Sequence, residues 1–236
     1  MRTATINCRE VLRATDPVLN RVRDIYETSF HSSERIPWDW LTWSLTAAWP
    51  HGRKTHMLTA RRTTASGRTQ TLGFIVASFL PRLGGYISYV AVDPRARGRG
   101  VGAFLYKSAI RRLRRTAHES GLRMPCLIWD SRPPSPSDPV EVRENWESRL
   151  HLFKKIGGQW IEGVQFTSPN FLNPRAGDVP LEFFLKPVEA SAERFSDARI
   201  RRVIHGLLSR VYRLDPEGRD RDLLREYALL RLAPIA

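Results

Sequence analysis

A short run of glycine and arginine, between an expected strand and an expected helix, is the part of the sequence best suited to chemistry. The run, called here the glycine-rich loop, consists of Arg97, Gly98, Arg99, Gly100, Val101 and Gly102. Glycines allow a tight turn and a close approach of backbone N–H groups to a ligand. The start of a helix adds N–H donors and the positive end of the helix dipole, and arginine adds forked donors. Together these features predict a phosphate-binding site.

Two common phosphate-binding motifs do not fit this loop. The Walker motif needs Gly-Lys-Ser/Thr at its end, whereas the sequence here reads Gly100-Val-Gly-Ala. The dinucleotide-binding motif needs Gly-x-Gly-x-x-Gly, whereas these glycines stand at alternate positions. The loop therefore belongs to another class of phosphate site.

The loop and the strand before it resemble the signature of the GNAT superfamily of N-acyltransferases, Arg/Gln-x-x-Gly-x-Gly/Ala after a strand ending in Ala-Val. Asp93-Pro94 and Leu105 also stand in register with this signature. The resemblance covers residues 4–186. It implies acetyl-CoA as co-substrate, with its pyrophosphate on the N–H groups of the glycine-rich loop. The pantetheine arm would pair with the strand end, which consists of Val90, Ala91 and Val92. A backbone N–H of this strand would stabilise the thioester oxyanion during direct attack by an acceptor amine.

Direct attack requires a group that takes the proton of the amine. The resemblance places a functional acid directly after the strand that ends at Trp129, which makes Asp130 a candidate base. A turn-capping role for Asp130 is an equal alternative. Glu34 lies in a segment similar to the acceptor side of one GNAT subgroup, with Glu27 nearby, and is a second candidate. An exposed ion pair is the alternative for Glu34.

The departing thiolate requires a proton donor, which in this family is usually a tyrosine on a late helix. Phe153 stands at that position, and the thiolate must then be protonated by water, His151 or another tyrosine. Tyr89 is a candidate donor, with a core role as the alternative. The resemblance also places Asn145 and Phe153 beside the cofactor. The departure at Phe153 leaves a second function open, that of a catalytically weak acyl-CoA-binding module with a partner-docking helical tail.

The alternation of strands and helices predicts an α/β (α+β) fold, in which helices flank a mixed, mostly antiparallel sheet. Strands are expected at residues 4–12, 55–61, 70–79, 86–92, 125–129, 159–166 and 181–186, and helices at 18–28, 38–48, 100–120 and 141–156. Residues 1–187 are expected to form the acyltransferase domain, and residues 188–236 a C-terminal helical extension. Helical spacing predicts two helices in the extension, at 200–211 and 223–230. The extension is expected to pack on its own domain, with a dimer interface or partner-binding arm as the alternative.

Four tryptophans are expected to pack in the core rather than to form a binding cage, with a role in lining the substrate channel as the alternative. They are Trp38, Trp40, Trp43 and Trp146.

The charge of the chain is concentrated near the glycine-rich loop. The 236 residues carry 38 Lys and Arg against 24 Asp and Glu, a net charge of +14. The stretch from Arg95 to Arg123 contains nine basic residues and one acidic residue, so it alone holds a net charge of +8. This placement favours a polyanionic cofactor over nucleic acid, which stays a possible partner. The amine acceptor, a small molecule or a protein amine, cannot be read from the sequence.

The cysteine, histidine and hydropathy patterns argue against several classes of protein. The 2 Cys and 6 His are scattered, so neither a metal site nor a disulfide framework is expected. The longest apolar run is far too short to span a membrane, and the first residues lack the apolar segment of a secretory signal. We therefore expect a cytoplasmic protein without membrane association, as a monomer or a homodimer.

Overall fold

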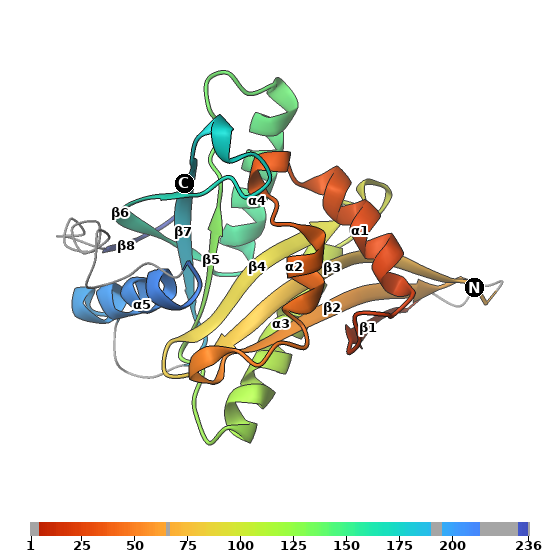
Figure 1. The fold of residues 1–236 in the computed structure, drawn as a ribbon, viewed down its shortest axis with the longest axis horizontal. Helices are drawn as coiled ribbons and strands as arrows, with labels where there is room; N and C mark the ends of the chain where they lie inside the picture. Colours follow the sequence, from red (N-terminus) through yellow and green to blue (C-terminus); the bar gives the residue numbers. More distant parts are fainter. Residues whose placement is uncertain (1–4, 65–66, 190–194, 213–230, 236) are drawn as a thin grey trace. The chain divides into compact units, whose positions relative to one another are not determined.

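The computed structural model of the chain describes residues 5–64, 67–189, 195–212 and 231–235 (Figure 1). The strands are β1 (Ile6–Val11), β2 (Lys54–Thr63), β3 (Thr69–Leu80), β4 (Gly84–Val92), β5 (Cys126–Ser131), β6 (Gln159–Ser168), β7 (Val179–Pro187) and β8 (Arg231–Ala233). The α-helices are α1 (Val18–Ser29), α2 (Trp38–Trp43), α3 (Val101–Glu119), α4 (Val140–Lys155) and α5 (Asp197–Arg210). These elements divide into two compact units. The first comprises residues 1–81, 85–123 and 170–177, and the second comprises residues 82–84, 124–169 and 178–236.

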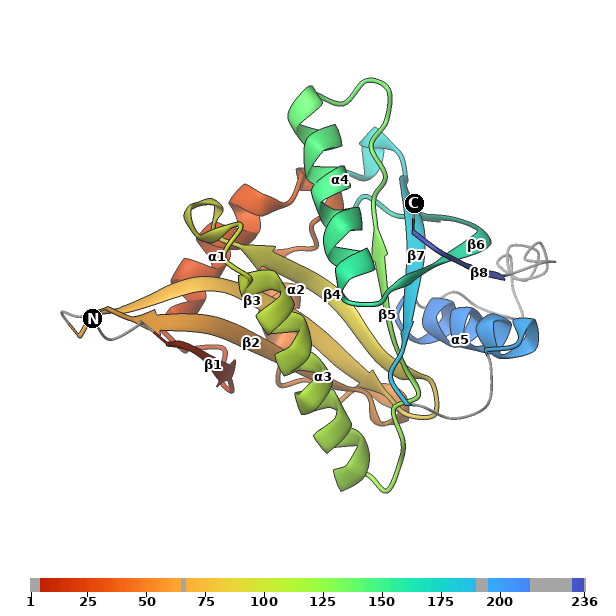
Figure 2. The same ribbon diagram turned by 180° about the vertical axis from the view of Figure 1, so that it is seen from behind.

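The first unit is built on strands in the order β1-β2-β3-β4, with antiparallel pairing of β1 with β2 and of β2 with β3. Successive side chains of a strand point to opposite faces. On β3, Phe74 lies in one core cluster with Tyr26 of α1, whereas Gly73 faces Leu105 of α3. Helices α1 and α3 therefore cover opposite faces of these strands, as Figures 1 and 2 show from the two sides.

A polar cluster ties α3 to the first two strands. His56 Nδ1 lies 2.6 Å from Oε1 of Glu10, and Arg112 Nε donates to the other carboxylate oxygen at 2.8 Å. The hydroxyl of Thr116, which is fully buried, lies 3.0 Å from His56 Nε2. Burial alone would raise the pKa of Glu10, but the hydrogen bonds from His56 and Arg112 outweigh it and lower that pKa. The cluster holds an ionised carboxylate between β1, β2 and α3.

The second unit is built on strands in the order β5-β7-β6-β8, and its pairs are antiparallel. Helix α4 packs on one face, where Phe153 contacts the rings of Trp129 on β5 and Phe184 on β7. The neighbouring residues along these strands, Asp130 and Phe183, are register partners and point to the other face. Tyr212, two residues after the end of α5, packs against Phe183 on that other face.

The fold class expected from the sequence is confirmed, and most expected elements lie within a few residues of the observed ones. Helix α2 is shorter than expected, because it ends at Trp43 rather than at residue 48. The extension expected to be helical contains α5, but it also contributes strand β8, which the sequence analysis missed. The helix expected at residues 223–230 lies outside the described residues. The predicted boundary at residue 187 stays a prediction.

The expectation that the tryptophans of α2 lie in the core is wrong for two of them. Trp40 and Trp43 are each 55% exposed, whereas Leu41 between them is buried. Trp40 contacts the ring of Phe171, and Trp43 that of Trp49, with centroids 5.9 and 5.2 Å apart. Trp40 and Trp43 stand three residues apart and therefore lie on one side of α2, which is exposed, whereas Leu41 lies on the buried side.

Candidate functional site

The start of the glycine-rich loop is anchored by a buried aspartate. Asp93 follows β4, is 3% exposed, and accepts a hydrogen bond from the backbone N–H of Arg95 at 3.0 Å. Its other carboxylate oxygen pairs with the guanidinium of Arg21 on α1. The backbone N–H of Asp93 donates to the carbonyl of Leu72 on β3 at 2.8 Å. These bonds fix the direction in which the chain leaves the sheet and enters the loop.

Two glycines of the loop combine a left-handed backbone with open space in front of them. Gly98 has φ 72° and Gly100 has φ 76°, a conformation that favours glycine. A Cβ added at either position would meet no atom within 4 Å. Gly100 directly precedes α3, whose first N–H groups have no partner within the helix. The loop therefore presents helix N–H donors and the exposed Arg97 and Arg99 to an unobstructed space, which suits a pyrophosphate group.

The end of β4 is held close to β3 by a glycine that the sequence analysis missed. A Cβ at Gly73 would lie 2.5 Å from the carbonyl oxygen of Ala91 and 3.3 Å from the side chain of Leu105. Ala91 is buried, while Val90 and Val92 are partly exposed. Gly73 thus permits the close packing that fixes the strand end assigned to the pantetheine arm. The available signal was a glycine inside an otherwise apolar strand.

Two residues proposed for proton transfer, Tyr89 and Glu34, meet in the first unit. The Tyr89 hydroxyl donates to the backbone carbonyl of Glu34 at 3.1 Å and accepts from the N–H of Ile36 at 3.3 Å. Burial raises the pKa of Tyr89 well above its usual value, so the phenol keeps its proton at neutral pH. The Glu34 carboxylate caps its own turn by accepting from the N–H of His31. Tyr89 thus orders the loop that carries Glu34, and the catalytic roles of both residues stay predictions.

In the second unit, Asp130 has a partner that the sequence analysis missed. The hydroxyl of Tyr212, two residues after the end of α5, donates to Oδ2 of Asp130 at 2.7 Å. The Tyr212 ring packs edge-on against Phe166 and Phe183, with centroid distances of 4.6 and 6.4 Å. Because 82 residues separate the two polar groups along the chain, no local pattern marks the pair.

Phe153, which replaces the expected tyrosine, is 4% exposed and belongs to an aromatic cluster. Its ring centroid lies 5.3 Å from that of Trp129 and 4.9 Å from that of Phe184. Asn145 lies two turns earlier on α4 and is exposed. Arg149, between them, donates to the hydroxyl of Ser131 at 3.1 Å. The roles of Asn145 and Phe153 beside a cofactor stay predictions.

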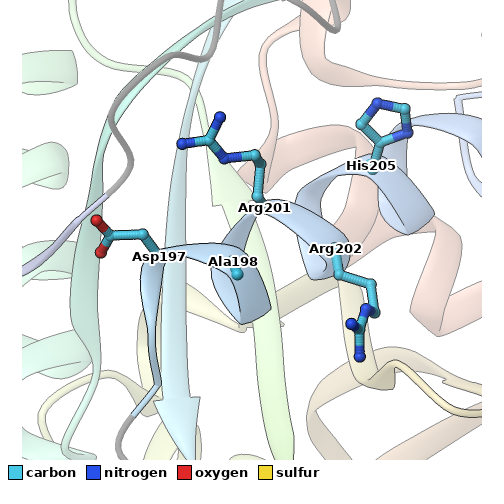
Figure 3. A pocket seen from close by; sticks show the side chains of 5 residues that line it. All are labelled: Asp197, Ala198, Arg201, Arg202 and His205. Atoms are coloured by element: carbon cyan, nitrogen blue, oxygen red, sulfur yellow. The ribbon is translucent and has the colours of Figure 1, made fainter.

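Other features of the described residues offer no second site. A hollow of about 590 Å³ is lined by residues of α5 alone, namely Asp197, Ala198, Arg201, Arg202 and His205. Figure 3 shows the Arg201 and Arg202 side chains pointing away from each other, so they do not converge on one ligand. In the parts of the chain that the structure describes, no group of His, Cys, Asp and Glu side chains is arranged to hold a metal ion. No helix within these parts has the length and apolar character needed to cross a bilayer.

Antiparallel strands flanked by helices, with a glycine-rich loop leading from a strand into a long helix, are the arrangement that the resemblance to the N-acyltransferases implies. Residues 19–126 match the model of the acetyltransferase (GNAT) family. This match confirms the resemblance and the acyltransferase class expected from the sequence.

Comparison with solved structures supports the same fold. Ard1 from Thermoplasma volcanium is 22% identical, with a TM-score of 0.50 over 78% of this chain and 98% of that chain. A GNAT-family acetyltransferase from Staphylococcus aureus Mu50 is 11% identical, with a TM-score of 0.50 over 78% of this chain and all of that chain. A search among curated proteins found no match. At these identities the likeness concerns the fold.

Proposed function

We propose that the chain is an N-acetyltransferase that moves an acetyl group from acetyl-CoA to a primary amine of a small molecule or a protein. The observation that carries this proposal is the open, left-handed glycine pair at the start of α3, flanked by Arg97 and Arg99. The N–H groups of residues 97–102 bind the pyrophosphate, and residues 90–92 pair with the pantetheine arm. The family match supports the choice of an acyl donor over other polyanions.

The proposed reaction is a direct attack of the amine nitrogen on the thioester carbonyl carbon. A C–N bond forms, the C–S bond breaks, and a backbone N–H at the end of β4 stabilises the oxyanion between these events. The amine proton passes to a carboxylate, for which Asp130 and Glu34 are the candidates, and the thiolate takes a proton from water or from a tyrosine. The chain supplies positions and dipoles and forms no covalent intermediate.

Binding of the donor is tested by thermal unfolding with and without acetyl-CoA. Ligand that binds only the folded state raises the melting temperature, and we expect such a rise at millimolar acetyl-CoA. Arg97→Ala and Gly100→Glu should abolish it, because one removes a forked donor and the other places a carboxylate in the phosphate space. Arg123→Ala, beyond the far end of α3, is the matched control and should keep the rise. Absence of any rise in the wild-type protein would refute the proposal.

A second function remains open because Phe153 cannot donate a proton. An acyl-CoA-binding module with weak catalysis would show the same thermal shift as an enzyme. A turnover assay that follows free thiol release from acetyl-CoA, with pools of primary amines, separates the two. We expect amine-dependent thiol release; a thermal shift without it would favour the binding module. Mass spectrometry of the acetylated products would then identify the acceptor.

A further inference from the structure

Two tryptophans of α2 stand exposed on the first unit, beside an apolar loop. Trp40 and Trp43 are each 55% exposed, and Phe171 and Leu172, in the loop between β6 and β7 that belongs to this unit, are 37% and 44% exposed. The rings of Trp40 and Phe171 are in contact, with centroids 5.9 Å apart. These four side chains, called here the α2 patch, form an exposed apolar surface of the kind that marks an interaction site.

Ring contacts connect α2 to the strand that is proposed to bind the donor. Trp38, the first residue of α2, contacts Tyr26 of α1 with centroids 5.8 Å apart, and Tyr26 contacts Tyr89 of β4 at 5.0 Å. Tyr89 directly precedes residues 90–92, which are proposed to pair with the pantetheine arm. Leu41 of α2 is buried in the same core cluster as Tyr26. Helix α2 therefore lies two ring contacts away from the donor strand, within a single unit.

Charge at the patch favours an amine over an anion. Asp39 is the one charged residue of α2, in a chain whose net charge is +14. Arg23, whose guanidinium lies 6.0 Å from the centre of the Trp38 ring, is already paired with Glu27 at 2.8 Å. An amine is a cation in water, and it is attracted both to a carboxylate and to the face of a tryptophan ring. The α2 patch therefore suits a partner that presents an amine beside apolar side chains.

We propose that the α2 patch binds apolar side chains next to the amine of a polypeptide acceptor, an inference that rests on the proposed acetyltransferase function. Trp40 and Trp43 stand three residues apart on one side of α2, so together they cover more than one apolar side chain. Small ligands bind in enclosed pockets, whereas exposed aromatic side chains are typical of contacts with a polypeptide.

Two other occupants fit the patch less well. An anionic membrane attracts lysine and arginine on the exposed face of a helix, whereas α2 presents a carboxylate. A second copy paired through the same patch would bring Asp39 of both copies into one apolar interface, where like charges repel. An amine-bearing polypeptide has neither disadvantage.

The proposal is tested with two peptides that differ only in the side chains beside the amine. One begins with leucine and phenylalanine and the other with serine and asparagine, before a common glycine-rich segment. We expect thiol release from acetyl-CoA with a kcat/KM at least about tenfold higher for the apolar peptide, mainly through a lower KM. A second pair carries the same residues around an internal lysine, with a blocked N-terminus. Preference in either pair supports the proposal, and the two pairs distinguish an N-terminal amine from a side-chain amine.

Variants of α2 connect this preference to the patch. Trp40→Ala and Trp43→Ala should each reduce the ratio of kcat/KM between the two peptides at least about fivefold, whereas Trp40→Phe keeps an aromatic ring and should retain most of it. Asp39→Asn should raise KM about twofold for both peptides, because it removes an exposed charge that attracts the amine. Leu12→Ala removes another apolar side chain of the first unit, 71% exposed, and should keep the wild-type ratio. Calorimetric titration of the apolar peptide without acetyl-CoA should give the same order of affinities.

Five results would overturn the inference. The first three are equal kcat/KM values for the two peptides, a preference that survives in folded Trp40→Ala and Trp43→Ala proteins, and faster turnover of phenethylamine than of the apolar peptide. Dimerisation in sedimentation that is lost in Trp43→Ala would show that a second copy covers the patch. Binding to phosphatidylglycerol vesicles that is lost in Trp43→Ala would assign the patch to a membrane.

The proposed function fails in a different way from the patch. A protein that binds the apolar peptide through Trp40 but shows no thermal shift with acetyl-CoA would refute the acyl donor and leave the patch as a peptide-binding surface. A protein with the thermal shift and amine-dependent thiol release, but without the peptide preference, would remain an acetyltransferase and refute the role of the patch.

Discussion

Two glycines at opposite ends of α3 allow a controlled test of the phosphate site. Gly100 precedes the helix with φ 76°, and Gly121 follows it with φ 66°. A Cβ added at either position meets no atom within 4 Å. The substitutions Gly100→Ala and Gly121→Ala therefore impose the same backbone strain without a steric clash, and they differ only in which end of the helix they modify.

The expected cost in stability is the same for both variants. A residue with a Cβ in the left-handed region costs about 1–2 kcal/mol in the free energy of unfolding. For a chain of this size each kcal/mol corresponds to a fall of about 2–4 °C in melting temperature. Both variants should therefore melt about 2–8 °C below wild type, which thermal unfolding without ligand will measure.

Binding should distinguish the two variants. At position 100 the methyl group projects into the space assigned to the pyrophosphate and displaces an anionic oxygen from a backbone donor. Loss of one hydrogen bond to a charged group is worth about 1.5–3 kcal/mol, which is roughly a tenfold to hundredfold increase in Kd. Isothermal titration calorimetry with acetyl-CoA should show this increase for Gly100→Ala and a wild-type Kd for Gly121→Ala. Equal affinities for both variants and wild type would refute the assignment of the loop.

Three further substitutions test the packing that supports the loop. Asp93→Asn removes the buried charge that pairs with Arg21; it should lower the free energy of unfolding by about 1–3 kcal/mol and weaken acetyl-CoA binding, as denaturant titration and calorimetry will show. Gly73→Ala drives a Cβ to 2.5 Å from the Ala91 carbonyl and should lower stability by about 1–3 kcal/mol with a loss of donor binding; unchanged binding would separate the β4 end from the donor site. Glu10→Gln removes a carboxylate whose pKa is lowered in the folded state, so its stabilisation exists above the unfolded pKa of about 4.3 and is lost as pH falls through the lower folded pKa. Denaturant titrations at neutral pH should show Glu10→Gln less stable than wild type, and the gap should close in acid; a gap independent of pH would contradict the ionised state of Glu10.

The sequence predicted the glycine-rich loop because all of its determinants are local. A strand, a turn and a helix start follow one another within some twenty residues, and the glycines mark the positions with positive φ. The supporting bonds are not local. Asp93 pairs with Arg21 across 72 positions, and Tyr212 reaches Asp130 across 82. Single residues of these types occur anywhere on a surface, so only the folded chain reveals them as pairs.

Two errors in the secondary structure predicted from the sequence arise because that structure depends on contacts outside the local pattern. Strand β8 is three residues long and forms by pairing with β6, which makes tertiary pairing and not local propensity the source of its structure. Helix α2 was expected to run to residue 48, because aromatic and apolar residues recur up to that point. Its C-terminal end is set instead by Ser44, whose hydroxyl bonds back to the carbonyl of Leu41 at 2.6 Å.

The basic stretch around α3 does not act as one surface. Arg97 and Arg99 are exposed at the N-terminal end of the helix, where they reinforce its N–H donors. Arg115 lies 14 residues after Val101, which at 1.5 Å per residue is about 21 Å along the axis, too far to share the same phosphates. Arg112 turns inward instead, toward the Glu10 carboxylate. The net +8 of this stretch therefore divides among the proposed donor site, an internal ion pair and an exposed helix face, and this division argues against a continuous track for nucleic acid.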